Sequence, residues 1–189
     1  MSDVLAPGAC IGILGGGQLG RMLSVAASRL GLRCHIYDPA PNPPAGHVAE
    51  RVTTAAWDDD AALRAFAQSV DVITYEFENI PTATLDLLES LSPVRPGRQA
   101  LAVSQDRLTE KDFLSGLGLS TAPYRDVPDA AALTAALAEV GTPAILKTRR
   151  LGYDGKGQAR IMDPTQAEAA LADMAGQAAI LERFVQFSR

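Results

Sequence analysis

The sequence predicts an α/β fold in which a doubly wound parallel sheet is followed by a smaller α+β unit. Up to about residue 91, short apolar runs alternate with segments of helix length, which is the order of parallel strands and crossover helices. A glycine-rich turn joins the first apolar run to the first helical segment, at residues 15–20. After Arg98 the order becomes strand, helix, strand, strand, helix, strand, and the two adjacent central strands indicate a hairpin.

Four strands and three helices are predicted in the first part. The strands are expected at residues 10–14, 33–37, 52–54 and 70–75, and the helices at residues 19–30, 61–69 and 82–91. Gly31 is expected to end the first helix in the left-handed conformation, and residues 58–60 offer an aspartate N-cap for the second. The stretch 39–46 contains four prolines and is therefore expected to be a loop.

The second part is expected to start between residues 100 and 120. Residues 101–116 are predicted to form one charged helix. The strands that follow are expected at residues 124–127, 144–148, 158–162 and 179–185, and the helices at residues 130–140 and 164–174.

Composition and charge exclude several classes of protein. Hydrophobic residues make up 47% and charged residues 21% of the 189 residues, which excludes intrinsic disorder as the main state. A net charge of −5 argues against nucleic acid or an anionic membrane as a partner. No apolar run of about 18 residues is available to span a membrane, and the first residues lack the pattern of a signal peptide. Cys10 and Cys34 are therefore expected as reduced thiols in a cytoplasmic protein, and neither belongs to a Cys/His cluster with zinc spacing.

The turn at residues 15–20 has the pattern G-x-G-x-x-G between a strand and a helix. Glycines let the backbone approach an anion, and the amides at the start of the helix point toward it. Asp38 follows at the end of the next strand, where a dinucleotide enzyme binds a ribose hydroxyl. The turn is therefore compatible with NAD or FAD, with another phosphorylated ligand, or with no ligand at all.

A second glycine-rich turn, at residues 147–158, lies between two strands. It does not open a helix, so it is not a Walker A loop. A glycine hairpin with Lys156 at its tip is suited to close over a triphosphate, and Lys147 at a strand end would place a second charge beside it. The alternative is an ordinary hairpin with solvated lysines.

Carboxylates mark two further strand ends. Glu182 lies among apolar residues, and its carboxylate could accept from an adenine amino group while the backbone of Phe184 and Val185 reads the base edge. Glu76 ends a buried strand of the parallel sheet, where such folds bind ligands, and could accept from ribose hydroxyls. The alternatives are a solvated carboxylate at 182, and a simple helix cap at residues 78–79.

Four segments occur in the order and at the spacing of a known family, namely residues 12–22, 75–81, 107–111 and 146–158. Together they resemble the N5-carboxyaminoimidazole ribonucleotide synthetase family, purine-pathway enzymes of the ATP-grasp superfamily. The resemblance covers nearly the whole chain. It implies a Rossmann-like pre-ATP-grasp domain with a parallel sheet at residues 1–105, a small α+β ATP-grasp lid subdomain with its linker helix at 106–181, and the start of the large ATP-grasp domain at 182–189.

The resemblance also implies site residues. ATP contacts are expected from Arg107, Lys147, Gly152, Tyr153, Asp154, Gly155, Lys156, Gly157, Gln158, Glu182, Arg183, Phe184 and Val185. The residues of this set expected to act in catalysis are Lys147, Tyr153 and Lys156. The ribonucleotide is expected to meet Gly17, Gln18, Leu19, Glu76, Tyr153 and Asp154.

The family reaction follows from the same resemblance. ATP and Mg²⁺ phosphorylate bicarbonate to carboxyphosphate, and the carboxyl group passes to the exocyclic amine of 5-aminoimidazole ribonucleotide. Cationic clamps and a closing lid suit this chemistry, because negative charge accumulates and carboxyphosphate is labile in water. The family's metal ligands are expected beyond residue 189, so no metal ligand is assigned and this segment alone is expected to be inactive. The full-length enzyme is expected to be a homodimer.

Other functions stay open at this point. An NAD-dependent Rossmann oxidoreductase would use residues 15–20, and a non-catalytic nucleotide-binding fragment would use residues 147–158. A sister ATP-grasp transformylase would depend on formate and glycinamide ribonucleotide, and residues 75–81 disfavour it.

Overall fold

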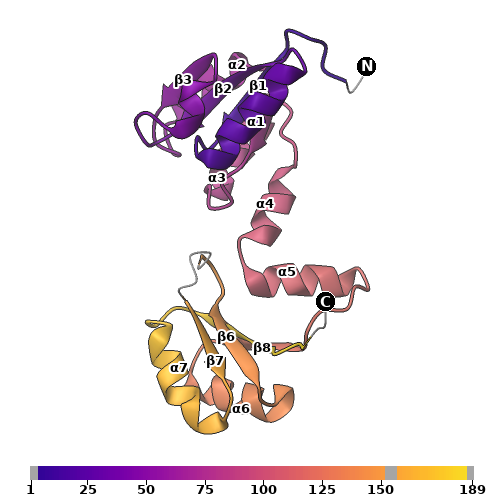
Figure 1. Ribbon diagram of the computed structural model, residues 1–189, viewed down its shortest axis with the longest axis vertical. Coiled ribbons are helices and arrows are strands. Elements are labelled where there is room, and N and C mark those ends of the chain that lie inside the picture. The colour runs from indigo at the N-terminus through magenta and orange to yellow at the C-terminus, as the bar shows by residue number, and fades with distance from the viewer. Residues whose placement is uncertain (1–3, 152–156, 187–189) are drawn as a thin grey trace. The chain divides into compact units, whose positions relative to one another are not determined.

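The structure, a computed structural model, describes residues 4–151 and 157–186. It divides into two compact units, Met1–Ala102 and Val103–Arg189, and each has its own sheet and its own apolar core (Figure 1). The predicted assignment of three domain segments, at residues 1–105, 106–181 and 182–189, stays a prediction. Among the described residues, no helix is both long and apolar enough to cross a bilayer.

The first unit is the predicted doubly wound parallel sheet. Its strands are β1 (Cys10–Leu14), β2 (Arg33–Asp38), β3 (Arg51–Thr54) and β4 (Val72–Tyr75). They pair in the order β3-β2-β1-β4, and all three pairings are parallel. The helices of this unit are α1 (Gln18–Arg29), η1 (Pro44–His47), a short 3-10 helix, α2 (Asp60–Gln68) and α3 (Thr82–Glu89).

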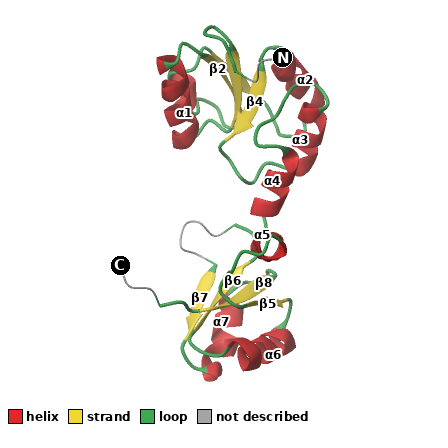
Figure 2. Ribbon diagram, turned by 90° about the vertical axis from the view of Figure 1, so that its right-hand side faces the viewer, coloured by secondary structure: helices red, strands yellow, loops and turns green. Residues whose placement is uncertain are grey.

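Alternating side chains on the strands give this sheet two buried faces. Ile13 and Ile36 pack with Ala27 of α1 on one face, whereas Leu14 and Tyr37 pack with the residues of α2 and α3 on the other. Figure 2 shows α1 on one side of the sheet and α2 and α3 on the opposite side. Gly31 has a φ of 74°, so α1 ends in the left-handed conformation that was predicted.

Two predicted elements were wrong. The stretch 39–46 is not all loop, because η1 begins at Pro44, and proline is well suited to the first position of a helix. The single helix expected at residues 101–116 is two helices, α4 (Arg98–Ser104) and α5 (Arg107–Gly116). Asp106 separates them, since its extended backbone cannot continue a helix and its carboxylate accepts the amides of Leu108 and Thr109.

The second unit is the predicted α+β arrangement. Its strands are β5 (Tyr124–Val127), β6 (Ala144–Thr148), β7 (Gln158–Ile161) and β8 (Ala179–Arg183). They form one antiparallel sheet in the order β5-β8-β6-β7, in which β6 and β7 are the expected hairpin. Its other helices are α6 (Ala130–Val140), η2 (Pro164–Gln166) and α7 (Ala167–Asp173).

One face of this second sheet is apolar and the other is polar. Leu146 and Leu181 lie opposite each other and belong to the core that α6 and α7 cover. The neighbouring positions face the other way, because side chains alternate along a strand. They include Tyr124, Asp126, Ile145, Lys147, Gln158, Ile180 and Glu182. Of the residues predicted to contact ATP, this polar face carries Lys147, Gln158 and Glu182.

The His35 imidazole is buried in the first unit and is fully hydrogen-bonded. Its Nδ1 lies 2.8 Å from Ser69 Oγ and its Nε2 lies 2.8 Å from Thr53 Oγ1. Burial lowers the pKa of His35 below its usual 6.5, and the nearby Arg51 lowers the pKa further. The folded state therefore holds this ring neutral at pH values where the unfolded chain takes up a proton.

We predict that this ring makes the first unit sensitive to mild acid. The contribution of neutral His35 to stability is complete above pH 6.5 and is lost as the pH falls below that value, because the unfolded state then binds more protons. Urea unfolding at pH 7.5 and at pH 5.5 should show a larger loss of stability for the wild type than for His35→Gln. Equal losses in the two proteins would contradict this.

Candidate functional site

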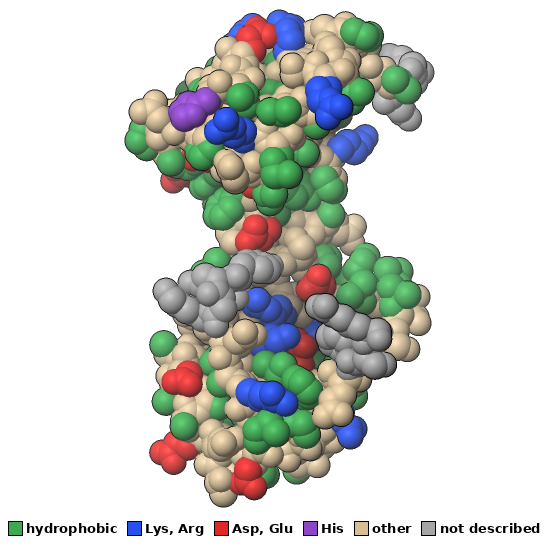
Figure 3. All heavy atoms as spheres, viewed as in Figure 1, with side chains coloured by type: hydrophobic (Ala, Val, Ile, Leu, Met, Phe, Trp, Pro, Cys, Tyr) green, Lys and Arg blue, Asp and Glu red, His purple; other side chains and the backbone are tan. Residues whose placement is uncertain are grey.

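The polar face of the second sheet contains a partly buried ion pair between neighbouring strands. Lys147 Nζ, on β6, donates to Glu182 Oε2, on β8, at 3.1 Å. Glu182 is 9% exposed, so its carboxylate is largely removed from water. Basic side chains gather with acidic ones on part of the second unit's surface (Figure 3). The two residues predicted to contact the phosphates and the base of ATP are therefore direct neighbours.

A second lysine reaches the same carboxylate oxygen. Lys111, on α5, places its Nζ 3.6 Å from Glu182 Oε2, and its side chain is 15% exposed. The ammonium also lies 5.4 Å from the centre of the Tyr124 ring, a favourable cation–π distance. Glu182 thus lies between two cations that come from different elements.

Arg107, one helical turn before Lys111 on α5, binds the end of strand β6. Its Nη1 donates to the carbonyls of Thr148 and Leu151, both at 2.7 Å, and its backbone amide donates to the carbonyl of Arg149 at 2.9 Å. These contacts fix the point where the chain leaves β6 for the glycine turn. Arg107 therefore shapes the start of the turn, and its predicted contact with ATP stays a prediction.

Arg149 anchors the start of α5 to the same sheet. Its Nη2 donates to Asp106 Oδ2 at 2.8 Å and its Nε lies 3.1 Å from both Asp106 oxygens, which is a two-pronged contact. Burial alone would raise the pKa of the Asp106 carboxyl. Hydrogen bonds from Arg149 and from the amides of Thr109 and Leu108 outweigh burial and hold that pKa below its ordinary value.

The predicted adenine hinge, residues 182–185, consists of the last two residues of β8 and the two residues that follow. The Phe184 amide donates to the Pro143 carbonyl at 3.0 Å, and the Arg183 amide donates to the Pro123 carbonyl at 2.8 Å. The Arg160 guanidinium lies 4.2 Å from the centre of the Phe184 ring. Of the backbone groups expected to read a base, the Phe184 amide is thus already engaged, which leaves the Phe184 carbonyl and the backbone of Val185.

Part of the predicted lid lies outside the described residues, namely Gly152, Tyr153, Asp154, Gly155 and Lys156. The described end of the turn is closely packed. Gly157 has a φ of 70°, and a Cβ placed there would lie 2.8 Å from Thr148 Oγ1. Its carbonyl accepts the Thr148 amide at 2.8 Å. The next residue, Gln158, lies opposite Lys147 on the polar face, and its predicted contact with ATP stays a prediction.

Two backbone amides of the glycine turn in the first unit donate to carboxylates of the chain itself. The Gly16 amide donates to Asp38 Oδ2 at 2.6 Å, and the Gly17 amide donates to Glu76 Oε1 at 2.8 Å. Pro43 covers Gly16 so closely that an added Cβ would lie 2.5 Å from the proline Cβ. A dinucleotide would need those amides for its pyrophosphate and Asp38 for its ribose, so the geometry disfavours NAD.

The remaining residues predicted for the ribonucleotide lie beside this turn. Gln18 and Leu19 start α1 and are exposed. Glu76 follows β4 and reaches across to Gly17. The structure thus brings Gly17, Gln18, Leu19 and Glu76 together at the carboxyl ends of β1 and β4, where doubly wound sheets bind ligands.

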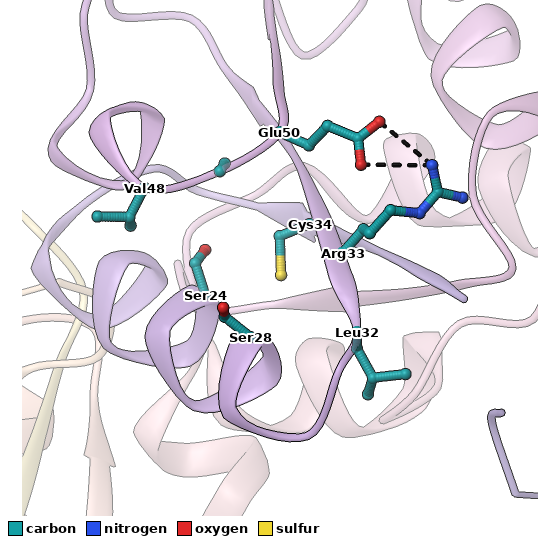
Figure 4. A pocket seen from close by; sticks show the side chains of 8 residues that line it. Ser24, Ser28, Leu32, Arg33, Cys34, Val48 and Glu50 are labelled. Atoms are coloured by element: carbon teal, nitrogen blue, oxygen red, sulfur yellow. Dashed lines mark hydrogen bonds and ion pairs between the residues drawn. The ribbon is translucent and has the colours of Figure 1, made fainter. Parts of the chain in front are cut away.

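A cavity of about 270 Å³ lies elsewhere in the first unit (Figure 4). It is lined by Ser24, Ser28, Leu32, Arg33, Cys34, Val48, Ala49 and Glu50. Arg33 begins β2, so the cavity lies at the amino end of that strand, away from the edge that binds ligands in such sheets. Burial raises the pKa of the Cys34 thiol, which disfavours the reactive thiolate.

Comparison with known proteins gives two family matches. The model of the ribonucleotide synthetase preATP-grasp domain matches residues 9–105, which is more than half of the chain, and the ATP-grasp domain model matches residues 112–189. An N5-carboxyaminoimidazole ribonucleotide synthase from Brucella melitensis is 52% identical over 98% of this chain and 52% of its own length. One from Pseudomonas aeruginosa is 43% identical over 94% of this chain and 49% of its own.

The chain belongs to the N5-carboxyaminoimidazole ribonucleotide synthetase family.

Solved structures of this family agree. An ADP complex of one such synthetase is 41% identical, covers 100% of this chain and 50% of that chain, and has a TM-score of 0.92. A synthase from Aspergillus clavatus in complex with ADP and 5-aminoimidazole ribonucleotide is 28% identical, covers 96% of this chain and 48% of that chain, and has a TM-score of 0.85. The chain spans about half the length of the curated relatives it matches. Membership in the synthetase family confirms the predicted resemblance and replaces the oxidoreductase alternative.

Lys111 and Arg149 take part in the ion pairs of the polar face, although neither of them was assigned a role from the sequence. Lys111 lay inside the motif at residues 107–111 but was given no role, although its four-residue spacing from Arg107 puts both on one helix face. Arg149 lay inside the second glycine-rich segment, and nothing in the sequence pairs it with Asp106. Among the described residues, no three His, Cys, Asp or Glu side chains cluster as metal ligands.

Packing at the end of the turn makes Gly157 sensitive to substitution. Gly118 is a matched control, because its φ is 78° but a Cβ there would meet nothing within 4 Å. Gly118→Ala should cost about 1 kcal/mol for the left-handed backbone, and Gly157→Ala about 2–3 kcal/mol, because the contact with Thr148 adds to that strain. Urea denaturation measures both, and equal costs would show that the contact relaxes freely.

Proposed function

We propose that the chain supplies the ribonucleotide-facing domain and the nucleotide-gripping subdomain of an ATP-dependent carboxylating ligase. The reaction converts 5-aminoimidazole ribonucleotide, bicarbonate and ATP into N5-carboxyaminoimidazole ribonucleotide, ADP and phosphate. The observation that carries the proposal is Lys147 beside Glu182 on the polar face, in a chain that is 52% identical to an N5-carboxyaminoimidazole ribonucleotide synthase over 187 residues.

The proposed chemistry proceeds in two transfers. A bicarbonate oxygen attacks the γ-phosphorus of ATP, the bond from that phosphorus to the ADP oxygen breaks, and carboxyphosphate forms. The carboxyl carbon then leaves the phosphate and bonds to the exocyclic amine nitrogen of the ribonucleotide, which loses a proton. Lys147 suits the first transfer, because a fixed ammonium stabilises negative charge on the phosphoryl oxygens.

Finer parts of this proposal rest on the family resemblance. Bicarbonate is the carboxyl donor, Mg²⁺ accompanies ATP, and the full-length enzyme is a cytoplasmic homodimer. Mg²⁺ prefers oxygen ligands in octahedral geometry, and the described residues offer no such cluster. No catalytic step is therefore assigned to a metal held by this part of the chain.

The proposed function predicts a specific pattern of ADP release by the natural gene product. ADP release from ATP should depend on both bicarbonate and 5-aminoimidazole ribonucleotide. Formate with glycinamide ribonucleotide serves as the control pair and should give no release. Release that depends on the control pair would move the protein to the transformylase class, and ATP binding with no release would indicate a nucleotide-binding fragment.

Lys147→Ala should reduce ADP release by about 100-fold or more, because one fixed charge at a phosphoryl group is typically worth that much. Its unfolding midpoint should change little, since Lys111 remains beside Glu182. Arg125→Ala is the control, because the contacts it removes, an ion pair with Glu139 and a bond to the Tyr124 carbonyl, are exposed. It should change neither quantity. Parallel losses of activity and stability in Lys147→Ala would assign the lysine to folding.

A further inference from the structure

Two lysines lie beside Glu182, and the proposed ATP site uses only one of them. Lys147 and Lys111 both approach Glu182 Oε2, at 3.1 and 3.6 Å. The proposed function assigns Lys147 to the phosphates of the nucleotide and assigns nothing to Lys111. The Glu182 side chain, which is 12% exposed, thus has two ammonium partners, and the proposed reaction needs one of them elsewhere.

Lys111 is held in this position by the fold. Its side chain is 15% exposed and points from α5 to the polar face of the sheet. Tyr124 lies directly opposite Glu182 on neighbouring strands, and its ring faces the Lys111 ammonium. The Tyr124 hydroxyl donates in turn to Asp112 Oδ1 of α5 at 2.7 Å. Lys111 therefore differs from a solvated surface lysine.

The second lysine matters for the energy of the Glu182 carboxylate when Lys147 moves. When Lys147 turns toward a phosphate, its bond to Glu182 weakens or breaks. A buried carboxylate left without a partner is strongly unfavourable, and that cost would subtract from nucleotide binding. Lys111 needs to move by less than an ångström to take a hydrogen-bonding position on the same oxygen.

We propose that Lys111 is the resident counter-ion of Glu182, which releases Lys147 to bind nucleotide phosphates. Lys111 is thus a positioning residue, because it acts on the nucleotide through Glu182 and Lys147. The inference rests on the proposed function, since it needs a nucleotide at this face. Without Lys111, Glu182 holds Lys147 as its remaining partner, and the phosphates must compete with the carboxylate for one ammonium.

A role of Lys111 in folding alone makes different predictions. In that case its loss would lower stability and leave the affinity of the folded protein for ATP unchanged. In the counter-ion role, affinity falls, arginine at position 111 restores it, and removal of the charge on Glu182 makes Lys111 dispensable. The last relation is a double-mutant coupling, which a purely structural lysine would not show.

The test is calorimetric titration of the natural gene product with Mg·ATP, together with thermal unfolding. Lys111→Met should weaken ATP binding by about tenfold, the order expected when an ion pair is disturbed at a partly buried site. Lys111→Arg should stay within about threefold of the wild type, since the charge is kept. Arg125→Met, which removes a charge from an exposed pair in the same unit, is the control and should bind as the wild type does.

The double variant decides between the two roles. In a Glu182→Gln background, Lys111→Met should change ATP affinity by less than about twofold, because no buried charge needs a partner. An unchanged affinity in Lys111→Met, or an equal loss in both backgrounds, would overturn the inference and leave the proposed function standing. Failure of the wild type to bind ATP would overturn both.

Discussion

The contacts on the polar face of the second unit depend on one largely buried carboxylate, that of Glu182. It lies between two lysines, Lys111 and Lys147. The opposite face of this sheet packs into an apolar core. The charge of Glu182 therefore requires partners on its own face. The antiparallel register supplies one partner from the next strand, and helix α5 supplies the other. The same contacts bring three charged groups together on the face where we propose that the nucleotide binds.

Helix α5 is attached to this face by polar contacts. None of its residues is buried, and its contacts with the sheet include Asp106 to Arg149, Arg107 to two carbonyls, and Lys111 to Glu182. Hydrogen bonds and ion pairs weaken when one partner moves, because they depend on distance and direction. Apolar packing is non-directional and is less sensitive to such a movement. The position of α5 is therefore coupled directly to the charges of the site.

Much of the fold could be predicted from local signals. Helix α6 and strands β5 and β6 have the predicted bounds, because Asp129 caps the helix, Gly141 ends it and alternation marks the strands. The split between α4 and α5 could not be predicted in this way, since Asp106 also fits a charged helix. Its role as a cap depends partly on Arg149, which lies 43 positions further along the chain.

The site could be predicted as a set of residues but not as a set of contacts. Lys147 and Glu182 were each expected at a nucleotide, but their bond depends on the register of two strands 35 positions apart. The bond from Gly17 to Glu76 spans 59 positions and turns an expected anion-binding amide into an internal contact. Long-range pairings of this kind leave no local pattern in the sequence.

We propose that nucleotide phosphates bind beside Lys147 on the polar face of the second sheet. A crystal structure of the natural gene product with a non-hydrolysable ATP analogue tests it most directly. We expect a phosphate oxygen within hydrogen-bonding distance of Lys147 Nζ and the adenine ring beside residues 182–185. An analogue bound at the glycine turn of residues 15–20, with the Lys147 to Glu182 bond intact, would contradict it.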